Sequence, residues 1–573
     1  MFKSFIKNSE NRDEKRWILL TLLFAFIFEF FLGLQGFDLC DEGFALTSYQ
    51  QIFNSPSSIE YHFLYYLSIF VGGVWNLFFG FGGILSFRIL SVIVIVFTIY
   101  FTYLSTKQFI KIEVIPVATL SVLILHEYGL LVFYHNYFTS FLLSIGVYLI
   151  LNSLNKNSYT KLFAGFFFIG MNVFSRIPNI TMLSLAILIF IDHVYKKNTR
   201  ILVKNISFGL LGFIGGIITI IIVMIIFGHF EIFKEAIQNL IYVMSDSDNS
   251  HSISNLIRNY ISNYITIYTF FSIFIFSTVL FVCLYNYTNK KRLKILCITI
   301  FSLIIIIFIF RNFKSEKYYS VILPPIIISY FIDYKNKTTI LLNTASLIIM
   351  FFLPIGSDFG ISNMGDSSIW LATFISTGHI YRFIHYQILQ KNNYSYLLFS
   401  ICFLVLFLNT GLYRISKKAY FDSGSRFKKC YRANNDKFSV FTTKEKVEIL
   451  NELLLELDKY IDSNDYLFAF ESLPAIHYLT ETKPYMCNAW PWTYSPEIFK
   501  FYLEKSISNN PWPVVLRQKC EPISGNWTIP ISENLNKDTY RYKINRVLHF
   551  ENFLLEYNYK LVWENDLFSI YIH

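Results

Sequence analysis

The sequence predicts a polytopic α-helical membrane protein with a C-terminal extramembrane α/β domain, and three observations lead to this fold class. The chain is 54% hydrophobic and only 15% charged, whereas soluble globular proteins carry about 25% charged residues. Its mean hydropathy is +0.44. Long runs of Phe, Ile and Leu recur as far as residue 413 and then stop. This composition excludes a single large soluble enzyme, a disordered chain and a coiled coil.

Apolar runs predict about thirteen transmembrane helices, because a helix needs about 20 mostly apolar residues to cross the hydrocarbon core. We expect these helices at 17–36, 87–106, 113–134, 137–153, 161–175, 177–193, 206–228, 264–286, 293–310, 318–333, 339–355, 369–389 and 394–413. The run 61–83 is apolar too. Its glycines and aromatic residues favour interfacial helices or a re-entrant segment within a first outer loop at 37–86.

The distribution of basic residues predicts the orientation of the chain. The net charge is +10, and most of the excess lies in short clusters between apolar runs, which does not require a nucleic-acid partner. With the N-terminus in the cytoplasm, the outer loops carry only Arg176, Lys234, Arg258, Arg311, Lys314 and Lys317. The positive-inside rule therefore divides the chain into a transmembrane domain, 1–413, and an outer C-terminal domain, 414–573.

The C-terminal domain has the ordinary composition of a soluble α/β unit. The periodicity of 444–461 predicts a helix, and 466–470 and 513–518 read as buried strands. A second helix is expected at 545–557, followed by one closing strand in 560–573. Alternating helices and strands of this kind predict a small α/β fold.

The first outer loop contains acidic residues without a nearby base. Asp38, Asp41 and Glu42 lie at the membrane surface, where an unpartnered carboxylate is costly. Asp41 and Glu42 are adjacent and point to different sides of a helix start, so one could accept a proton while the other orients or binds. The alternative interpretation is that Asp41 simply caps a surface helix.

An Asp-Glu pair just after the first span resembles the hallmark of C-type (GT-C) membrane glycosyltransferases. The chain is most similar to glycosyltransferase family 39, which includes protein O-mannosyltransferases and the lipid A aminoarabinose transferase. FRILSV (87–92), FSRIPN (174–179) and KYYSVILPP (317–325) resemble that family's motifs in order and sidedness. The resemblance covers 17 to about 366, and the expected number of spans with an outer C-terminal domain matches the aminoarabinose-transferase layout.

The resemblance implies a polyprenyl-phosphate sugar donor and inverting transfer on the non-cytoplasmic face. Asp41 would be the catalytic base, with Glu42 supporting the site. The resemblance also implies no metal and no other cofactor, although oligosaccharyltransferases of the wider superfamily use a metal ion. The chain departs from the pattern at its second outer loop, where Tyr134, His135 and Asn136 replace an acidic residue of many relatives. His135 and Asn136 are candidates for substrate binding, or His135 caps the end of a span.

Transfer from a lipid phosphate needs cations, because the leaving phosphate gains charge in the transition state. The outer-side candidates for donor phosphate binding are Arg88, Arg176, Arg311, Lys314 and Lys317. Three of them form the only basic cluster expected on the outer face, against the positive-inside trend. Arg88 sits at the edge of a span and could instead extend its side chain to the interface.

Three further features are candidates for binding or for packing. Tyr318 could contact substrate or belong to the aromatic belt of the membrane. The loop 354–366 contains Asp358 and is rich in Gly, Ser and Asn, which lets backbone groups approach a sugar or simply forms a turn. The Trp/Tyr/Pro stretch 489–494 could stack on carbohydrate or pack inside its domain. Cys40 could form a disulfide with another outer cysteine.

The leading hypothesis is therefore a membrane glycosyltransferase of a bacterial inner membrane, acting on its periplasmic side. The acceptor could be a glycan, a lipid or a protein. One alternative is a glycan ligase or polymerase with a lipid-diphosphate donor. Another is a transporter of lipid-linked sugars, which should show ionisable residues at mid-span and two matching halves. A receptor or anchor that works through its C-terminal domain leaves the acidic first loop unexplained.

Overall fold

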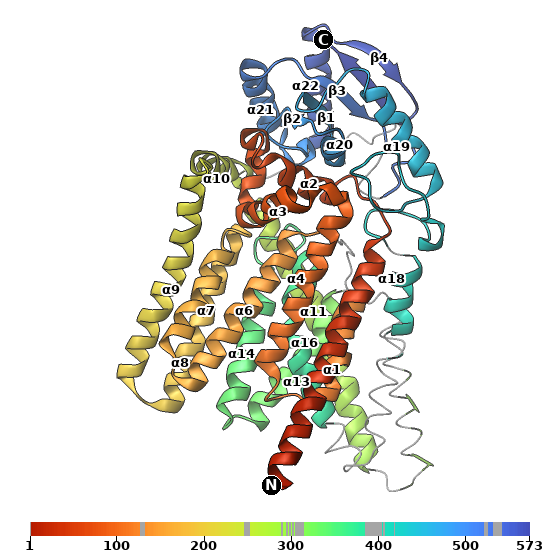
Figure 1. Cartoon of the computed structure of the whole chain (residues 1–573). Helices are drawn as coiled ribbons and strands as arrows, with labels where there is room; N and C mark the ends of the chain where they lie inside the picture. The colour runs from red at the N-terminus through yellow and green to blue at the C-terminus, as the bar shows by residue number, and fades with distance from the viewer. Residues whose placement is uncertain are drawn as a thin grey trace.

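The structure is a computed structural model of the whole chain. It describes residues 2–125, 132–245, 252–287, 315–383, 407–417, 419–520, 525–530 and 541–573, with isolated positions between 288 and 406. Helices stand side by side through the first two thirds of the chain, and a unit that contains a β-sheet lies at one end of them (Figure 1). The chain begins at the opposite end of the helices from that unit (Figure 1).

Helices account for nearly all of the regular structure before the sheet. The α-helices are α1 (Phe2–Gly33), α2 (Asp41–Gln51), α3 (Tyr66–Phe79), α4 (Gly83–Thr106), α5 (Ile115–Leu125), α6 (His135–Lys156), α7 (Tyr159–Asn172), α8 (Ile187–Lys196), α9 (Thr199–Ile226), α10 (Phe230–Ser245), α11 (Ile253–Tyr287), α13 (Ser315–Ile332), α14 (Lys337–Phe352), α15 (Ile361–Ser368), α16 (Trp370–Phe383) and α18 (Leu412–Ser416). The shorter helical turns are η1 (Pro56–Tyr65), η2 (Gly80–Gly82), η3 (Ile112–Val114), η4 (Ile177–Ala186) and η6 (Phe407–Gly411).

Six helical segments in the described part of the chain are long and apolar enough to cross a membrane. They are Glu14–Gly33, Pro56–Thr106, His135–Lys156, Ile177–Lys196, Thr199–Ile226 and Ile253–Ser277. Ile112–Leu125 and Lys337–Phe352 are shorter apolar helices that coincide with two further expected spans. The expected spans 293–310 and 394–413 fall for the most part outside the described residues. The total of about thirteen spans stays a prediction.

The segment expected to be interfacial forms η1 and α3. These elements lie with α2 at the end of the helices that faces the sheet (Figure 1). At the far end of α3, Leu77, Phe78 and Phe81 are strongly exposed. The chain then turns through η2 into α4. Because exposed apolar side chains at a membrane surface are buried by lipid, this tip is suited to the outer interface.

Helices α7 and α9 approach each other most closely in the helical part. A Cβ atom on Gly212 would lie 2.2 Å from the carbonyl oxygen of Phe163, and one on Gly216 would lie 2.2 Å from that of Phe167. Only glycine permits this backbone contact. Small residues at helix interfaces are typical of membrane proteins, where close van der Waals packing replaces the hydrophobic effect between helices.

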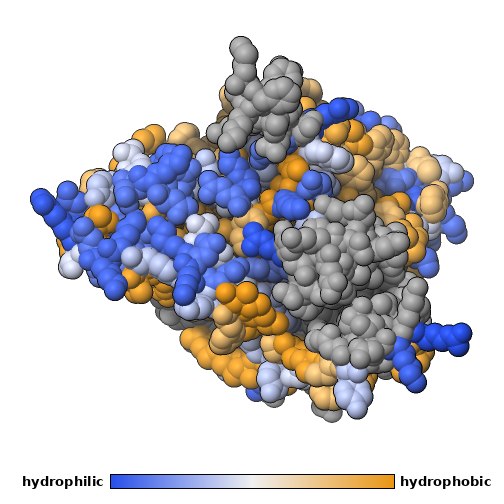
Figure 2. Space-filling model, turned by 90° about the horizontal axis from the view of Figure 1, so that it is seen from below, coloured by the Kyte–Doolittle hydropathy of each residue, from blue (hydrophilic) through white to orange (hydrophobic). Residues whose placement is uncertain are grey.

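The end of the helices opposite the sheet carries exposed basic residues. Figure 2 shows this end from below, with hydrophilic residues gathered over it and hydrophobic residues along its rim. The exposed bases at the helix ends and turns here are Lys107, Lys156, Lys197, Arg200, Lys204 and Lys335. The gathering of basic residues at one end agrees with a cytoplasmic position for it. The orientation itself stays a prediction.

The C-terminal part of the chain contains a mixed five-stranded sheet in the order β2-β1-β3-β5-β4. Its elements are η7 (Arg426–Lys428), α19 (Lys444–Leu457), β1 (Tyr466–Phe470), α20 (Pro474–Thr480), β2 (Lys483–Pro484), η8 (Pro491–Thr493), α21 (Pro496–Asn509), β3 (Val514–Gln518), α22 (Arg541–Glu556), β4 (Lys560–Glu564) and β5 (Phe568–Ile572). Strands β2, β1 and β3 are parallel, whereas β5 is antiparallel to both β3 and β4.

The expected strands and helices of this part match the structure, with one correction. The single closing strand in 560–573 is a hairpin of β4 and β5. Asn565 makes the turn, because its side-chain Oδ1 accepts hydrogen bonds from the backbone N–H groups of Leu567 and Phe568 at 2.9 and 2.8 Å. An Asn side chain of this kind reverses a strand over few residues, and the sequence Glu-Asn-Asp carries that signal.

The sheet rests on the first outer loop through backbone contacts. The Ala475 N–H donates to the Leu39 carbonyl at 3.0 Å, and the Thr47 hydroxyl donates to the Pro474 carbonyl at 2.8 Å. Helix α2 lies so close to α20 that a Cβ atom on Gly43 would come within 2.1 Å of the Ala475 nitrogen. The first loop is therefore held between the membrane helices and the C-terminal domain.

A buried charge cluster fastens the start of the C-terminal domain to the same loop. One oxygen of Asp422 accepts from Lys429 Nζ at 2.9 Å and Lys446 Nζ at 2.6 Å. The other accepts from the Phe37 N–H at 2.8 Å and the Thr442 hydroxyl at 2.7 Å. Burial alone raises the pKa of Asp422, but the two ammonium groups outweigh it and hold that pKa below its usual value.

Asp422→Asn should destabilise the protein by about 3–5 kcal/mol, because it leaves two buried ammonium groups without their carboxylate. Chemical denaturation of the detergent-solubilised protein, followed by tryptophan fluorescence, measures the change. Glu448→Gln is the matched control, since the Lys444–Glu448 pair is exposed and should contribute less than about 1 kcal/mol. Equal midpoints for Asp422→Asn and the control would show that the cluster does not hold this junction.

Candidate active site

Helix α2 starts at Asp41, and the carboxylate that caps it belongs to Asp38. Asp38 Oδ1 accepts from the Cys40 N–H at 2.9 Å, and Oδ2 accepts from the Glu42 N–H at 3.0 Å. Glu42 Oε2 accepts in return from the Asp38 N–H at 3.3 Å. This reciprocal arrangement resembles a capping box. The alternative interpretation, in which Asp41 caps the helix, is therefore wrong, and the Asp41 carboxylate is available for other contacts.

Glu42 and Arg88 form a buried bidentate ion pair. Arg88 Nε and Nη2 donate to Glu42 Oε1 and Oε2, each at 2.8 Å. The guanidinium also donates to the Gly33 and Gly36 carbonyl oxygens at 2.7 Å. These contacts join the end of α1, the start of α2 and the start of α4. Arg88 lies where it positions the first loop, which differs from the phosphate contact expected from the sequence.

Asp41 lies between two tyrosine hydroxyls that come from distant parts of the chain. The Tyr420 hydroxyl donates to Asp41 Oδ2, and the Tyr134 hydroxyl donates to Oδ1 at 3.3 Å. Burial raises the pKa of Asp41 to about 6, although both tyrosines oppose the shift, and Asp358 adds to it. A carboxylate with this pKa is well matched to accept a proton near neutral pH.

Arg176 supplies a buried positive charge near Tyr134 and Asp358, both of which also act on Asp41. Its Nη1 donates to the Leu353 carbonyl at 2.9 Å and its Nη2 to the Ile355 carbonyl at 3.1 Å. Burial lowers the pKa of Arg176 to about 10, while Tyr65, Asp358 and Tyr134 partly offset that shift. Among the described residues, Arg176 makes no ion pair. A buried guanidinium held only by carbonyl oxygens keeps its charge available for an anion.

His135 and Asn136 begin α6 next to Arg176. The His135 ring stacks on Tyr65 with centroids 4.1 Å apart, and the Arg176 guanidinium acts on it electrostatically. Asn136 Oδ1 and the Ser175 hydroxyl are buried and have no hydrogen-bond partner among the described residues. Buried polar atoms without partners are rare and costly, so these two mark a place where a ligand could bind.

Asp358 faces the same group of residues from the loop 354–366. Its Oδ1 accepts from the Asn363 side chain and the Phe359 N–H, both at 2.9 Å. Its charge acts on Asp41, Tyr65 and Arg176. The structure therefore places Asp358 near both Asp41 and Arg176, although these three residues lie far apart in the sequence.

The remaining candidates are not placed at Asp41. The Tyr318 hydroxyl donates to the Thr373 hydroxyl at 3.1 Å, within the contact between α13 and α16. Lys317 Nζ lies 4.9 Å from the ring centroid of Phe270 on α11. Arg311 and Lys314 lie outside the described residues. A phosphate-binding role for Lys317, Arg311 and Lys314 stays a prediction.

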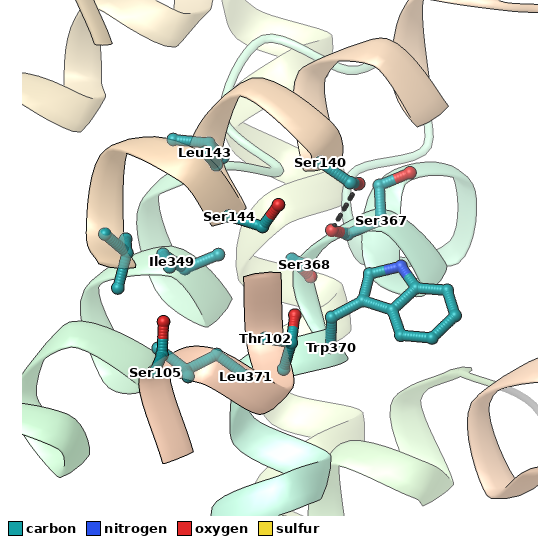
Figure 3. A pocket seen from close by; sticks show the side chains of 11 residues that line it. Thr102, Ser105, Ser140, Leu143, Ser144, Ile349, Ser367, Ser368, Trp370 and Leu371 are labelled. Carbon is teal, nitrogen blue, oxygen red and sulfur yellow. Dashed lines mark hydrogen bonds between the residues drawn. The ribbon is translucent and has the colours of Figure 1, made fainter. Parts of the chain in front are cut away.

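An uncharged pocket lies below this group between α4, α6, α14, α15 and α16 (Figure 3). Ser140 links the two places, because its hydroxyl donates to the Asn136 carbonyl at 3.2 Å and to the Ser367 carbonyl at 2.8 Å. Hydroxyls of the lining bond to helix carbonyls, as Ser144 does to Phe141 at 2.7 Å. The lining residues are Thr102, Ser105, Ser140, Leu143, Ser144, Val147, Ile349, Ser367, Ser368, Trp370 and Leu371. The pocket has no charged lining residue, and its volume of about 20 Å³ leaves room for little more than a water molecule.

Metal-ligating and thiol groups are dispersed in the part of the chain that the structure describes. There, no group of three His, Cys, Asp or Glu residues is placed to hold a metal ion. Cys40, Cys430, Cys487 and Cys520 form no disulfide with one another. The proposed disulfide of Cys40 does not form with any of them, and its Sγ instead lies 3.5 Å from the Ser472 carbonyl oxygen.

Three residues of the site were not found from the sequence. Tyr420 follows the last expected span and lies 379 positions after Asp41. Tyr65 stacks on His135, and Ser175 precedes Arg176 in a motif of which only the arginine drew attention. Tyrosine and serine are common at membrane interfaces, so no local signal separates these residues from their neighbours. Only the fold brings them to Asp41.

Comparisons with known proteins give a structural likeness and no sequence match. No protein-family model matches the chain, and no curated protein does. In structure the chain is similar to the oligosaccharyltransferase of Archaeoglobus fulgidus complexed with zinc and sulfate, at 11% identity and a TM-score of 0.48, over 87% of this chain and 68% of that one. It is similar to the same enzyme tethered to an acceptor peptide, at 11% identity and a TM-score of 0.47, over 88% of this chain and 69% of that one.

Tyr420→Phe should raise the pKa of Asp41 above about 6, because the lost hydroxyl stabilises the charged carboxylate. Difference infrared spectroscopy across a pH titration measures the shift, with Asp41→Asn identifying the carboxyl band. Tyr431→Phe is the matched control, since this tyrosine is exposed and should leave the band unchanged. An unchanged or lower pKa in Tyr420→Phe would contradict the arrangement.

Proposed function

We propose that the chain is a membrane glycosyltransferase of the GT-C type that acts at the periplasmic face of a bacterial inner membrane. It transfers a sugar, with inversion, from a polyprenyl-phosphate donor to the hydroxyl of a glycan, lipid or protein acceptor. One observation carries the proposal: a carboxylate with a pKa of about 6, Asp41, and a buried arginine that makes no ion pair among the described residues, Arg176, share Tyr134 and Asp358 as neighbours. A proton acceptor and an anion-binding group together suit transfer from a phosphate ester.

Asp41 is the general base of the proposed reaction. Its carboxylate takes the proton from the acceptor hydroxyl while that oxygen forms a bond to the anomeric carbon of the donor sugar. The bond between this carbon and the phosphate oxygen breaks, and its electron pair leaves with the phosphate. Attack from the face opposite the leaving group inverts the configuration. The base must be ionised first, so activity should rise with pH through the pKa of Asp41.

Arg176 stabilises the leaving phosphate in this proposal. Charge accumulates on the phosphate oxygens as the sugar bond breaks, and a fixed guanidinium in a dry site lowers the energy of that state. Asn136 and Ser175 can supply polar contacts to the sugar or phosphate through their unpartnered atoms. His135 lies close enough to Arg176 to take part in the same binding. No metal enters the mechanism, since the arginine carries the charge that a cation would supply.

Glu42 supports the site from behind through Arg88. Both groups hold the backbone that carries Asp41, so they act as positioning residues.

Asp41→Asn should reduce transfer by at least about 100-fold, the usual scale of general-base catalysis. The assay supplies a panel of radiolabelled polyprenyl-phosphate sugars to the purified protein in lipid. For the wild type, kcat/KM should fall as the pH drops below about 6. Full activity of a folded Asp41→Asn variant would exclude the base role. Transfer only from diphosphate donors would favour the ligase or polymerase alternative, and no transfer from any donor would favour a transporter.

Arg176→Gln should lower kcat by about 100-fold, because the transition state loses its cation. Arg258→Gln is the matched control, since this outer-side arginine on α11 is exposed and makes no ion pair with described residues. It should change kcat by less than twofold. A chelator should leave wild-type activity unchanged. Loss of activity in chelator, together with an active Arg176→Gln variant, would show that a metal ion, and not Arg176, stabilises the charge on the leaving phosphate.

A further inference from the structure

The carboxyl ends of the parallel strands point at the first outer loop. The segment after β1 reaches Cys40, whose Sγ lies 3.5 Å from the Ser472 carbonyl oxygen. The segment after β2 reaches η1, where the Tyr61 N–H donates to the Cys487 carbonyl at 3.2 Å. In open α/β sheets, ligands bind outside the carboxyl ends of the strands. This edge of the sheet therefore lies where a ligand of Asp41 could extend.

Trp492 is the exposed aromatic residue at this edge. Its N–H donates to the Glu471 carbonyl directly after β1, at 3.3 Å. The indole stacks on Trp490 with centroids 5.7 Å apart. It is 38% exposed, whereas Trp490 and Tyr494 are buried, so only part of the stretch 489–494 packs inside the domain. The Trp492 Nε1–H makes no hydrogen bond to a described residue. A ligand on the apolar face of the indole could therefore accept a hydrogen bond from it.

Aromatic contacts connect Trp492 to Asp41. The Trp490 ring lies 6.3 Å from the ring of Phe44, one turn of α2 after Asp41. Cys40, Phe44 and Trp490 form one buried cluster, and Phe421, which adjoins the Asp41 partner Tyr420, packs against it. One helical turn rises about 5 Å. An elongated ligand that touches Trp492 can thus reach Asp41 with its next units.

We propose that Trp492 binds a sugar ring of a saccharide acceptor whose reacting hydroxyl lies at Asp41. The acceptor role rests on the proposed glycosyltransferase function, and the binding itself does not. A pyranose offers an apolar C–H face to the indole and hydroxyls to its Nε1–H. Trp492 also lies beside a buried charged pair, because Arg546 Nε is 3.4 Å from Glu471 Oε1 and Arg546 Nη1 donates to the Trp492 carbonyl.

These surroundings favour a saccharide over a lipid tail. Binding sites for mixed ligands combine aromatic surface with a few placed polar groups. The Asn488 side chain donates to the Thr493 hydroxyl at 2.8 Å, and the Trp490 Nε1–H donates to the Ser472 hydroxyl at 3.0 Å, so polar atoms line the support of the indole. An acyl chain gains nothing from such groups, whereas ring hydroxyls can exchange hydrogen bonds with them.

Oxidation of single tryptophans by N-bromosuccinimide, read by mass spectrometry, tests the binding in the full-length protein in nanodiscs. The probes are chitohexaose, mannohexaose and maltohexaose. At least one probe should slow the oxidation of Trp492 and leave Trp512 unaffected. Trp512 is the matched control because it is 42% exposed but precedes β3, at the opposite end of the parallel strands. Equal oxidation of Trp492 with and without every probe would overturn the proposal.

Variants separate this inference from the proposed function. Trp492→Ala should weaken binding of the protecting hexasaccharide about tenfold, the scale of a lost aromatic contact, while Trp492→Phe keeps part of it and Trp512→Ala keeps all of it. Protection of Trp492 in a wild type that transfers no sugar would refute the proposed function alone. Quenching of Trp492 by brominated lipid, without saccharide protection, would identify it as a membrane contact and overturn the inference.

Discussion

The buried ion pair between Glu42 and Arg88 is the interaction on which the arrangement around Asp41 depends. From α4, the Arg88 guanidinium reaches both oxygens of Glu42 and the carbonyl oxygens of Gly33 and Gly36. A bidentate charge-assisted contact fixes orientation as well as distance. It holds the ends of α1, α2 and α4 together without touching the carboxylate of Asp41. Asp41, the residue next to Glu42, is thus fixed in place, while its own carboxylate is contacted by the neutral hydroxyls of Tyr134 and Tyr420.

The C-terminal domain contributes residues to the group around Asp41. The Asp422 cluster joins the domain to Phe37 in the first loop. Two residues earlier, Tyr420 places its hydroxyl on Asp41 and lowers the pKa that burial raises. The same attachment brings Trp490 against Phe44. The proton affinity of Asp41 and the packing of Phe44 therefore depend on residues from both ends of the chain, and loss of the Asp422 cluster would disturb both.

The sequence was informative where a feature depends on residues that are close together in the chain. The strand 466–470 follows from an apolar run, and the selection of Asp38, Asp41 and Glu42 as candidates follows from acids at a membrane surface. Arg88 could not be assigned, because an arginine at the edge of a span looks the same whether it meets phosphate, lipid or Glu42. The role of Arg88 depends on its partner Glu42, which lies 46 positions away in the sequence. Tyr420 gave no signal for the same reason. Asp38 caps the helix through local contacts, which short-range sequence reasoning could have found. The alternative interpretation considered only Asp41 as the cap.

Asp38, Asp41 and Glu42 lie within five residues of one another, and each carboxylate has different hydrogen-bond partners. Asp38 accepts two backbone N–H groups, yet burial and the charge of Asp41 raise its pKa well above the usual value. Glu42 gives both oxygens to a guanidinium. Asp41 receives only neutral hydroxyls, which stabilise its charge less than a cation would, so burial prevails and its pKa rises to about 6. The Glu42 carboxylate is held by the Arg88 guanidinium and the Asp38 carboxylate by the start of α2, so neither can turn toward a substrate. Of the three, Asp41 alone combines a raised pKa with partial exposure, and the proposed base role requires both properties.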